Sequence, residues 1–328
     1  MAVAAPSPIR CLAVLGPTAT GKTQLAVQLA RRFQGEVVSA DSRQVYRGLD
    51  VGTGKDLVDY GFGAEAVPYH LIDICDPGEV CHLFHYLELA RKAVRDIAAR
   101  GLLPIIAGGT ALYLNALLDE YELAGGAPDP ALRQELAALS EEQLLDLLRS
   151  EAPDLYERTD KTQRKRIVRA VEIARTRTEA DQTPSLTLDP LLLAPYYPRQ
   201  EVHRRIEQRL DARLNAGLIE EVAALHESGA PWEWLDDLGL EYRYVSRHLR
   251  GELSREEMRE ALFTKIRQFC KSQDIWARKM EREGKTIYWL PNGDLEQAAE
   301  LVQRFLAGQD LPAPQLRLME TFYGPRSN

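Results

Sequence analysis

Residues 16–23 read Gly-Pro-Thr-Ala-Thr-Gly-Lys-Thr, which is a complete G-x-x-x-x-G-K-[ST] phosphate-binding loop. An apolar run, 11–15, precedes the loop and a helical pattern follows it, so the loop joins a strand to a helix. Glycines let backbone N–H groups turn inward, and the positive end of the next helix attracts an anion. Thr23 also offers a hydroxyl to a Mg²⁺ ion. The residues expected to hold the phosphates are Gly16, Thr18, Thr20, Gly21, Lys22 and Thr23.

Two further loops carry groups that could act beside this phosphate-binding loop. Asp41 follows the strand-like run 36–39. A carboxylate there could bind Mg²⁺ or accept a proton from a nucleophile. Alternatively, Asp41 could cap a helix that starts at Ser42. Gly108-Gly109-Thr110 follows the run 102–107. Thr110 could bond a phosphate oxygen or a catalytic carboxylate, or simply begin a helix.

Short apolar runs alternate with helical patterns along the first part of the chain. Strands are expected at 36–39, 69–74 and 102–107, a helix at 82–100, and a last strand at 286–290. This alternation is typical of a parallel sheet, whose ligands lie beyond the carboxyl ends of the strands. We therefore expect an α/β fold with a P-loop NTPase-like parallel sheet covered by helices.

The pattern changes near residue 119, where the strands stop. Residues 129–150 have helical periodicity, and 158–177 form a basic helical stretch, so 119–198 is expected to be an inserted helical, basic subdomain. The flanking segments 9–118 and 199–295 would then form one catalytic core.

The composition is that of an ordinary globular protein. The 328 residues are 45% hydrophobic and carry a formal net charge of −8, which argues against indiscriminate coating of nucleic acid. Four cysteines form no C-x-x-C pair, and neither a signal peptide nor a membrane span is apparent. We expect a cytoplasmic monomer that does not contact membrane, with a loosely ordered tail at 310–328.

Four segments together resemble the tRNA dimethylallyltransferase family, also called tRNA isopentenyltransferases. The resemblance is densest over residues 10–118 and continues more loosely through 199–290. Its segments are the loop 16–23, Ser-Ala-Asp-Ser-Arg-Gln-Val-Tyr-Arg-Gly-Leu-Asp-Val-Gly-Thr-Gly-Lys at 39–55, His-Leu-Ile-Asp-Ile-Cys-Asp-Pro at 70–77, and Gly-Gly-Thr-Ala-Leu-Tyr-Leu at 108–114.

The resemblance implies that the loop binds dimethylallyl diphosphate, with Mg²⁺ as cofactor, and that the five-carbon group moves to N6 of adenosine 37 in tRNA. Asp41 matches the family's base, and Thr110 matches the threonine that helps hold the diphosphate and the base. The stretch 201–218 resembles a helix carrying an arginine that reaches the diphosphate. Arg205 and Arg209 are both candidates, while Arg213 could equally lie on a solvated face.

A tRNA substrate requires a positive surface, and its anticodon stem-loop is the expected partner. The basic stretch could grip phosphates while the adenine is extruded into a pocket, although a solvated helix is the ordinary alternative. The candidate tRNA contacts are Arg164, Lys165, Arg166 and Arg169 in that stretch, Arg43 and Gln44 beside Asp41, and Lys271 and Gln273 in a late helix.

Other functions stay open at this point. The main alternative is an adenylate isopentenyltransferase that acts on free AMP, ADP or ATP; a small-molecule P-loop kinase and a noncatalytic RNA-binding protein are further ones. Two departures from the family pattern lie outside the diphosphate half: Leu240 replaces a tyrosine after Gly239, and Ser272 replaces an arginine. The sequence therefore supports binding of the prenyl donor better than it supports the identity of the acceptor.

Overall fold

The computed structural model describes residues 7–119, 129–176 and 186–320. Its centre is a six-stranded, all-parallel sheet in the order β3-β2-β4-β1-β5-β6. The strands are β1 (Ile9–Val14), β2 (Gly35–Ser39), β3 (Tyr69–His70), β4 (Leu103–Ala107), β5 (Leu188–Tyr196) and β6 (Ile287–Pro291). The α/β fold expected from the sequence, a P-loop NTPase-like parallel sheet covered by helices, is confirmed.

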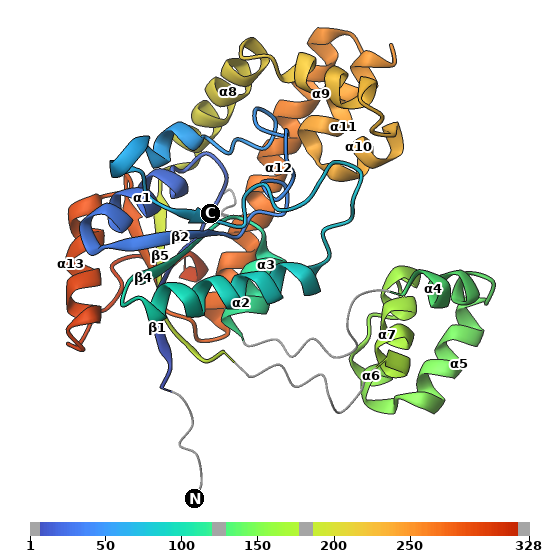
Figure 1. The fold of residues 1–328 in the computed structure, drawn as a ribbon, viewed down its shortest axis with the longest axis horizontal. Coiled ribbons are helices and arrows are strands. Elements are labelled where there is room, and N and C mark those ends of the chain that lie inside the picture. Colours follow the sequence, from blue (N-terminus) through green and yellow to red (C-terminus); the bar gives the residue numbers. More distant parts are fainter. Residues whose placement is uncertain (1–6, 120–128, 177–185, 321–328) are drawn as a thin grey trace, which may run out of the picture.

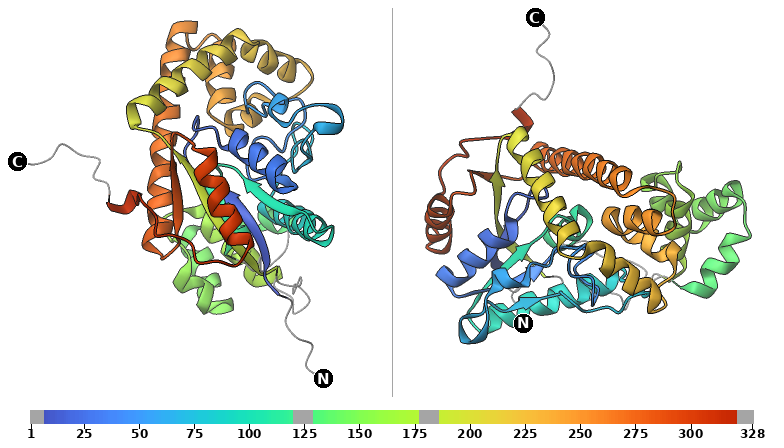
Figure 2. Two further views of the ribbon diagram at one scale, coloured as in Figure 1. Left: turned by 90° about the vertical axis from the view of Figure 1, so that its left-hand side faces the viewer. Right: turned by 90° about the horizontal axis from the view of Figure 1, so that it is seen from above.

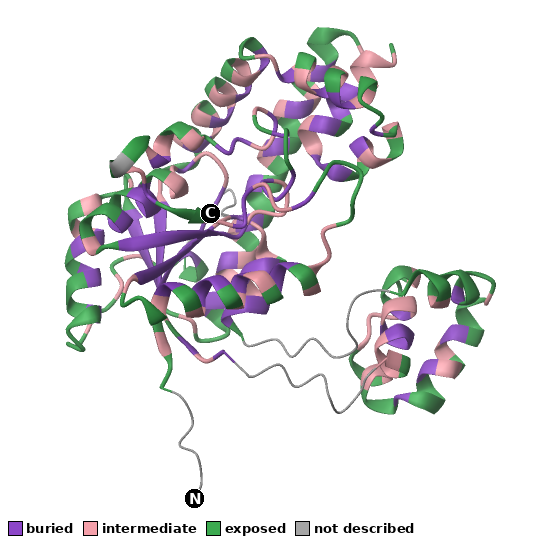
Figure 3. Cartoon of the chain, in the orientation of Figure 1, coloured by how far each residue is buried: buried purple, intermediate pink, exposed green. Residues whose placement is uncertain are grey.

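Helices cover both faces of this sheet, as Figures 1 and 2 show. Successive residues of β1 alternate between two apolar clusters, because side chains of a strand point to opposite faces. Leu12 and Val14 pack with α1 (Lys22–Phe33) and α13 (Leu295–Leu306), whereas Cys11 and Ala13 belong to the cluster that includes α2 (Leu83–Ala99) and α3 (Ala111–Leu118). Both clusters are buried, so β1 is covered on both sides (Figure 3).

A second layer of helices lies beyond the carboxyl ends of the strands (Figure 1). It consists of α8 (Arg199–Asn215), α9 (Leu218–Glu227), α10 (Trp232–Leu238), α11 (Leu240–Leu249) and α12 (Arg255–Arg282). Ser254 begins α12 with a capping box, in which its hydroxyl accepts from the Glu257 N–H while the Glu257 carboxylate accepts from the Ser254 N–H. At 1.5 Å per residue the 28 residues of α12 extend about 42 Å, and its Cys270, Ala277 and Met280 join the apolar cluster on the face of the sheet that includes Cys11.

A small bundle stands apart from the sheet, between two segments outside the described residues (Figure 1). It contains α4 (Pro130–Ala137), α5 (Glu141–Glu151), α6 (Pro153–Arg158) and α7 (Arg164–Thr176) around its own apolar cluster, which includes Leu144, Leu148 and Ile167. The buried Glu172 carboxylate of α7 pairs with Arg133 at 2.7 Å and with Arg169 at 3.3 Å. Because both partners neutralise it, the bundle can keep a carboxylate in its interior.

The structure corrects several details of the sequence prediction. Residues 188–196, assigned to the inserted subdomain 119–198, form β5, which pairs with β1 and β6 inside the sheet. The run 188–196 contains two prolines and was not recognised as a strand, although buried parallel strands often read as near-continuous apolar runs.

Other boundaries also differ. The helical pattern 129–150 is confirmed as α4 and α5, and Ser140 begins α5 with a capping box. The basic stretch is not one helix, however: Arg158 ends α6, Asp160 accepts from the Thr162 N–H in the connecting segment, and α7 begins at Arg164. Strand β3 is shorter than the expected 69–74. The tail is not loose over 310–320: Leu318 is buried, and Glu281 accepts from the N–H groups of Leu318 and Met319. Its remaining residues lie outside the described part.

We expect Gly108→Ala to destabilise the fold strongly. A Cβ at Gly108 would lie 2.2 Å from the carbonyl oxygen of Ala40, and backbone cannot move aside cheaply, so the free energy of unfolding should fall by at least about 2 kcal/mol. Gly101→Ala is the matched control: it has φ of +74° but nothing within 4 Å of its Cβ, so it should cost about 1 kcal/mol. Urea unfolding measures both; equal losses would contradict this account.

Candidate active site

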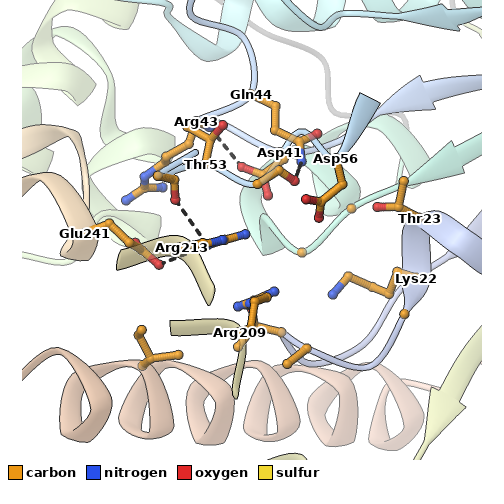
Figure 4. Close-up of a pocket in the computed structure, with 18 of the residues that line it drawn as sticks. Lys22, Thr23, Asp41, Arg43, Gln44, Thr53, Asp56, Arg209, Arg213 and Glu241 are labelled. Carbon is orange, nitrogen blue, oxygen red and sulfur yellow. Dashed lines mark hydrogen bonds and ion pairs between the residues drawn. The ribbon is translucent and has the colours of Figure 1, made fainter. Parts of the chain in front are cut away.

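A pocket of about 500 Å³ lies at the carboxyl ends of β1, β2 and β4, under the second helical layer. Of the candidate residues, those that line it are Thr18, Gly21, Lys22, Thr23, Asp41, Arg43, Gln44, Thr110, Arg205, Arg209 and Gln273. Figure 4 shows Asp41 on one side of this pocket and Lys22 and Arg209 on the other. The sequence-based candidates for donor binding and catalysis are thus largely brought together at one place.

The phosphate-binding loop has the geometry that its sequence predicts. Gly21 has φ of +81° and Ala19 has φ of +63°, both left-handed, and these turns bring the loop into the start of α1 at Lys22. Helix α1 begins without a side-chain cap, so its first N–H groups can serve an anion. Gly16 and Thr20 do not line this pocket; the buried Thr20 hydroxyl donates to the Pro17 carbonyl at 2.8 Å and so shapes the loop from behind.

Of the cationic side chains that line the pocket, Lys22, Arg209 and Arg213 lie close enough to repel one another. Lys22 Nζ donates to the Pro17 carbonyl at 2.7 Å, and Arg209 Nη2 donates to the Thr18 hydroxyl at 2.6 Å. Burial, followed by repulsion from Arg209, lowers the pKa of Lys22 to about 8, and burial, followed by repulsion from Arg213, lowers the pKa of Arg209 to about 10. Because the like charges of this cluster repel one another, a polyanion that neutralises them is bound favourably.

The sequence left Arg205 and Arg209 open as the diphosphate ligand, and in the structure these two side chains have different partners. Arg205 Nε donates to Glu201 at 2.8 Å and its guanidinium stacks over the Tyr197 ring at 3.7 Å, whereas Arg209 contacts the phosphate-binding loop itself. Arg213 is also in the pocket, with a side chain only 12% exposed, and is not on a solvated face. The spacing of four from Arg209, which places both arginines on one helix face, favoured this position over the solvated alternative.

Asp41 is held by its own loop rather than by a neighbouring cation. Its Oδ1 accepts from the Arg43 N–H at 2.9 Å, an arrangement typical of an aspartate turn. The loop is fixed from beside it, since the Thr110 hydroxyl accepts from the Ser42 N–H at 3.0 Å and the Thr110 N–H donates to Ala40. Thr110 therefore orients the loop that carries Asp41 and has no hydrogen bond to its carboxylate among the described contacts.

Gln44 and Arg43, the candidates beside Asp41, differ in their surroundings. The Gln44 amide is buried and bonded on both sides: its oxygen accepts from the Ser39 hydroxyl at 3.0 Å, and its nitrogen donates to the Gly54 carbonyl at 3.0 Å. Arg43 donates to the Ser42 hydroxyl at the pocket wall. Both side chains line the pocket, but the polar groups of Gln44 are already bonded within the protein.

The two candidates on α12, Gln273 and Lys271, also differ in their surroundings. The buried Gln273 of α12 accepts from the Thr18 N–H at 2.8 Å and donates to the Gly109 carbonyl at 3.0 Å, so it ties the phosphate-binding loop to the loop after β4. A Cβ at Gly109 would lie 2.5 Å from the Gln273 amide nitrogen, which explains a glycine at that position. Lys271 is exposed and borders a smaller cavity on the other side of α12.

The four candidates in the basic helix lie in the small bundle, not at the pocket. Arg164 Nη2 donates to the carbonyls of Leu136, Ala137 and Leu139 and so closes the end of α4. Arg166 pairs with Asp160 at 2.7 Å, and Lys165 is exposed. Arg169 pairs with the buried Glu172, so two of the four support the bundle itself.

Two family models match this chain. The family model described as IPP transferase matches residues 44–280, and the one described as Isopentenyl transferase matches residues 9–60. A tRNA dimethylallyltransferase 2 of Trichlorobacter lovleyi is 49% identical over 85% of this chain and 91% of its own length. The chain belongs to the tRNA dimethylallyltransferase family. The family that the sequence motifs resembled is thereby confirmed.

Other members of this family agree over similar lengths. A tRNA dimethylallyltransferase 1 of Hahella chejuensis is 48% identical over 90% of this chain and 97% of its own. The crystal structure of the tRNA isopentenylpyrophosphate transferase of Bacillus halodurans has a TM-score of 0.65 and 31% identity over 92% of this chain and 96% of its own. The chain is thus an enzyme of the prenyltransferase class. Among residues 7–119, 129–176 and 186–320, none of the helices could span a membrane.

We expect the affinity for inorganic diphosphate to depend on pH through Lys22. Burial lowers the pKa of Lys22 to about 8, so above that pH binding must also protonate the amine, and affinity should fall tenfold per pH unit. Below pH 7 the amine is already charged and its contribution should level off. Isothermal titration calorimetry with Mg²⁺ from pH 6.5 to 9.5 measures this dependence.

Lys22→Met is the control for the titration of the ligand itself. This variant should bind diphosphate weakly at every pH and retain only the pH dependence of the diphosphate. The same steep loss above pH 8 in Lys22→Met would contradict the assignment.

Proposed function

We propose that this chain transfers a dimethylallyl group from dimethylallyl diphosphate to N6 of adenosine 37 in tRNA and releases diphosphate. The observation that carries the proposal is the pocket itself, in which the carboxylate of Asp41 faces a cationic phosphate site built from Lys22 and Arg209. The family membership supports the choice of donor and acceptor, since the relatives compared are tRNA dimethylallyltransferases.

The cationic side of the pocket would stabilise the leaving group. As the bond between C1 of the donor and its bridging oxygen breaks, negative charge develops on the diphosphate. Lys22, Arg209 and the N–H groups at the start of α1 are already in place to receive that charge. An allylic carbon tolerates cationic character, so most of the catalytic effect would come from this stabilisation.

The oxygen atoms around the pocket also suit Mg²⁺. The Thr23 hydroxyl lines the pocket, and the carboxylate oxygens of Asp41 and Asp56 lie nearby in Figure 4, which are hard oxygen donors. Among the described residues there is no group of three His, Cys, Asp or Glu side chains that could hold a metal ion. A Mg²⁺ ion would therefore be held by Thr23 together with the phosphates of the substrate. It would neutralise charge on the diphosphate.

Asp41 would act as the base. The N6 amine of adenine is a weak nucleophile because its lone pair is delocalised into the ring, so removal of a proton as the new bond forms is useful. In the step, N6 bonds to C1, the C1–O bond breaks, the N6 proton moves to the Asp41 carboxylate, and the electron pair leaves with diphosphate. The bond from the Arg43 N–H occupies one oxygen of Asp41 and leaves the other for this proton.

Recognition of tRNA is proposed for surfaces outside the pocket. Lys165 and Arg166 of the small bundle and Lys271 of α12 are exposed and suited to phosphate contacts, whereas Arg164, Arg169 and Gln273 would act by holding those elements in shape. The anticodon stem-loop would then present its adenine at the pocket. We propose that the enzyme works as a monomer in the cytoplasm, where tRNA is found.

Competition between acceptors tests the function directly. Radiolabelled dimethylallyl diphosphate, Mg²⁺ and an equimolar mixture of unmodified tRNA and AMP should label the tRNA and leave AMP unlabelled. A tRNA transcript with guanosine at position 37 is the matched control and should stay unlabelled. Labelled AMP would support the adenylate isopentenyltransferase alternative, and the absence of any transfer by the folded, Mg²⁺-loaded enzyme would overturn the proposal.

We expect Asp41→Asn to lower kcat by about 10²–10⁴, the usual contribution of a positioned base, because an amide cannot take the N6 proton. The amide oxygen can still accept from the Arg43 N–H, so the loop and the thermal midpoint should change little. Single-turnover transfer to tRNA and diphosphate binding measure the two effects. A similar rate in Asp41→Asn and wild type would contradict the role of Asp41 as base.

A further inference from the structure

We infer that Glu221, on α9 and outside the pocket, is a positioning residue: its carboxylate fixes the loop 50–54 and, through that loop, holds Arg213 in the donor pocket. The inference deepens the proposed function and rests on it, because it concerns the same diphosphate site. Its evidence is a continuous series of hydrogen bonds from α9 to the pocket.

The first link is the binding of the Glu221 carboxylate by the loop backbone. One oxygen accepts from the N–H groups of Asp50, at 2.8 Å, and Val51, at 2.6 Å, and the other accepts from the Gly52 N–H at 3.0 Å. Successive N–H groups that point to one place form a concave anion site. The sequence Asp-Val-Gly-Thr-Gly-Lys at 50–55 thus forms such a site, and a carboxylate of the chain itself fills it.

A buried tyrosine also binds the carboxylate. The hydroxyl of Tyr242, on α11, donates to Glu221 at 2.8 Å, and the Tyr242 side chain is 1% exposed. A Cβ at Gly52 would lie 2.6 Å from the Tyr242 ring, so the loop backbone lies directly against the tyrosine. The carboxylate therefore has four donors and little freedom to move.

The second link runs from the loop to Arg213. The Gly52 carbonyl accepts from Arg213 Nη1 at 3.2 Å, and Glu241 lies 3.5 Å from the same nitrogen. A Cβ at Gly54 would lie 1.6 Å from Arg213 Nη2, so the guanidinium passes over the loop at a place where only glycine leaves room. Figure 4 shows Arg213 between Glu241 and the centre of the pocket.

Arg213 needs such support because it lies beside another cation. Burial, followed by the charge of Arg213, lowers the pKa of Arg209, so the two guanidinium groups repel each other. A carbonyl and a carboxylate that hold Arg213 from the outer side keep it near Arg209 despite this repulsion. If the loop moves, Arg213 can move away from the phosphate site.

The test measures the affinity for inorganic diphosphate in the presence of Mg²⁺, by isothermal titration calorimetry on the full chain. Glu221→Gln keeps the size of the side chain but has one acceptor oxygen for three N–H groups, and its amide N–H₂ opposes the backbone donors. We expect its dissociation constant to rise about 10-fold. Glu220→Gln, an exposed neighbour on the same helix, is the matched control and should bind as wild type does.

A double-mutant cycle with Arg213→Met separates positioning from a general loss of structure. Because Glu221 acts through Arg213, adding Glu221→Gln to Arg213→Met should weaken binding less than about twofold further. Independent, additive losses in the cycle would overturn the inference, and so would an unchanged affinity in Glu221→Gln. A purely structural role would lower the thermal midpoint in both backgrounds without this dependence on Arg213.

Tyr242→Phe is a milder second variant if Glu221→Gln does not fold. It removes only the hydroxyl that donates to Glu221, and it should weaken diphosphate binding severalfold in the wild-type background and not in Arg213→Met. Binding of diphosphate requires no transfer to tRNA. Failure of the cycle with intact transfer would refute the role of Glu221 alone, whereas failure of wild type to transfer would refute the proposed function.

Discussion

The rest of the structure depends on one constraint: three like charges must be held close together in a partly buried pocket before any substrate neutralises them. Lys22 comes from the start of α1, and Arg209 and Arg213 come from successive turns of α8. Burial and then mutual repulsion lower the pKa of Lys22 to about 8 and that of Arg209 to about 10, so these charges are unfavourable until an anion binds them. A site organised in this way gains most when a diphosphate enters.

Neutral hydrogen bonds, rather than counter-ions alone, hold that arrangement. The Pro17 carbonyl accepts from Lys22, the Thr18 hydroxyl accepts from Arg209, and the Gly52 carbonyl accepts from Arg213. Gln273 then ties the phosphate-binding loop to Gly109, and Thr110 ties that segment to the loop of Asp41. Because these partners carry no full charge, they position the cations without competing for them as an anion would.

The sequence predicted the parts of the site whose chemistry is local. The glycine spacing of the loop 16–23 identifies it as a phosphate-binding loop. Asp41 and Thr110 follow buried strands that must end at the same edge of a parallel sheet. The register of β2 with β4 pairs Ser39 with Ala107, which brings both loops together as expected. Strand β5 was missed because its proline-containing run lies within a stretch otherwise dominated by helical patterns.

The contacts between distant segments could not be predicted, since nothing local marks them. Glu221 lies 169 residues or more from the N–H groups that it binds, and it stands in an ordinary amphipathic helix. Gln273 was assigned to tRNA because of its place in a late helix, yet its amide is used inside the protein. In the basic helix, the charge pattern was visible but the partners of Arg164 and Arg169 were not, because they depend on how the bundle packs.

A crystal structure with Mg²⁺ and dimethylallyl thiodiphosphate, a donor analogue that reacts slowly, tests the central claim most directly. The account predicts that the diphosphate contacts Lys22, Arg209 and the N–H groups at the start of α1, with C1 of the prenyl group facing the Asp41 carboxylate across a gap wide enough for an amine. A diphosphate bound away from Lys22 and Arg209, or a C1 atom directed away from Asp41, would contradict it.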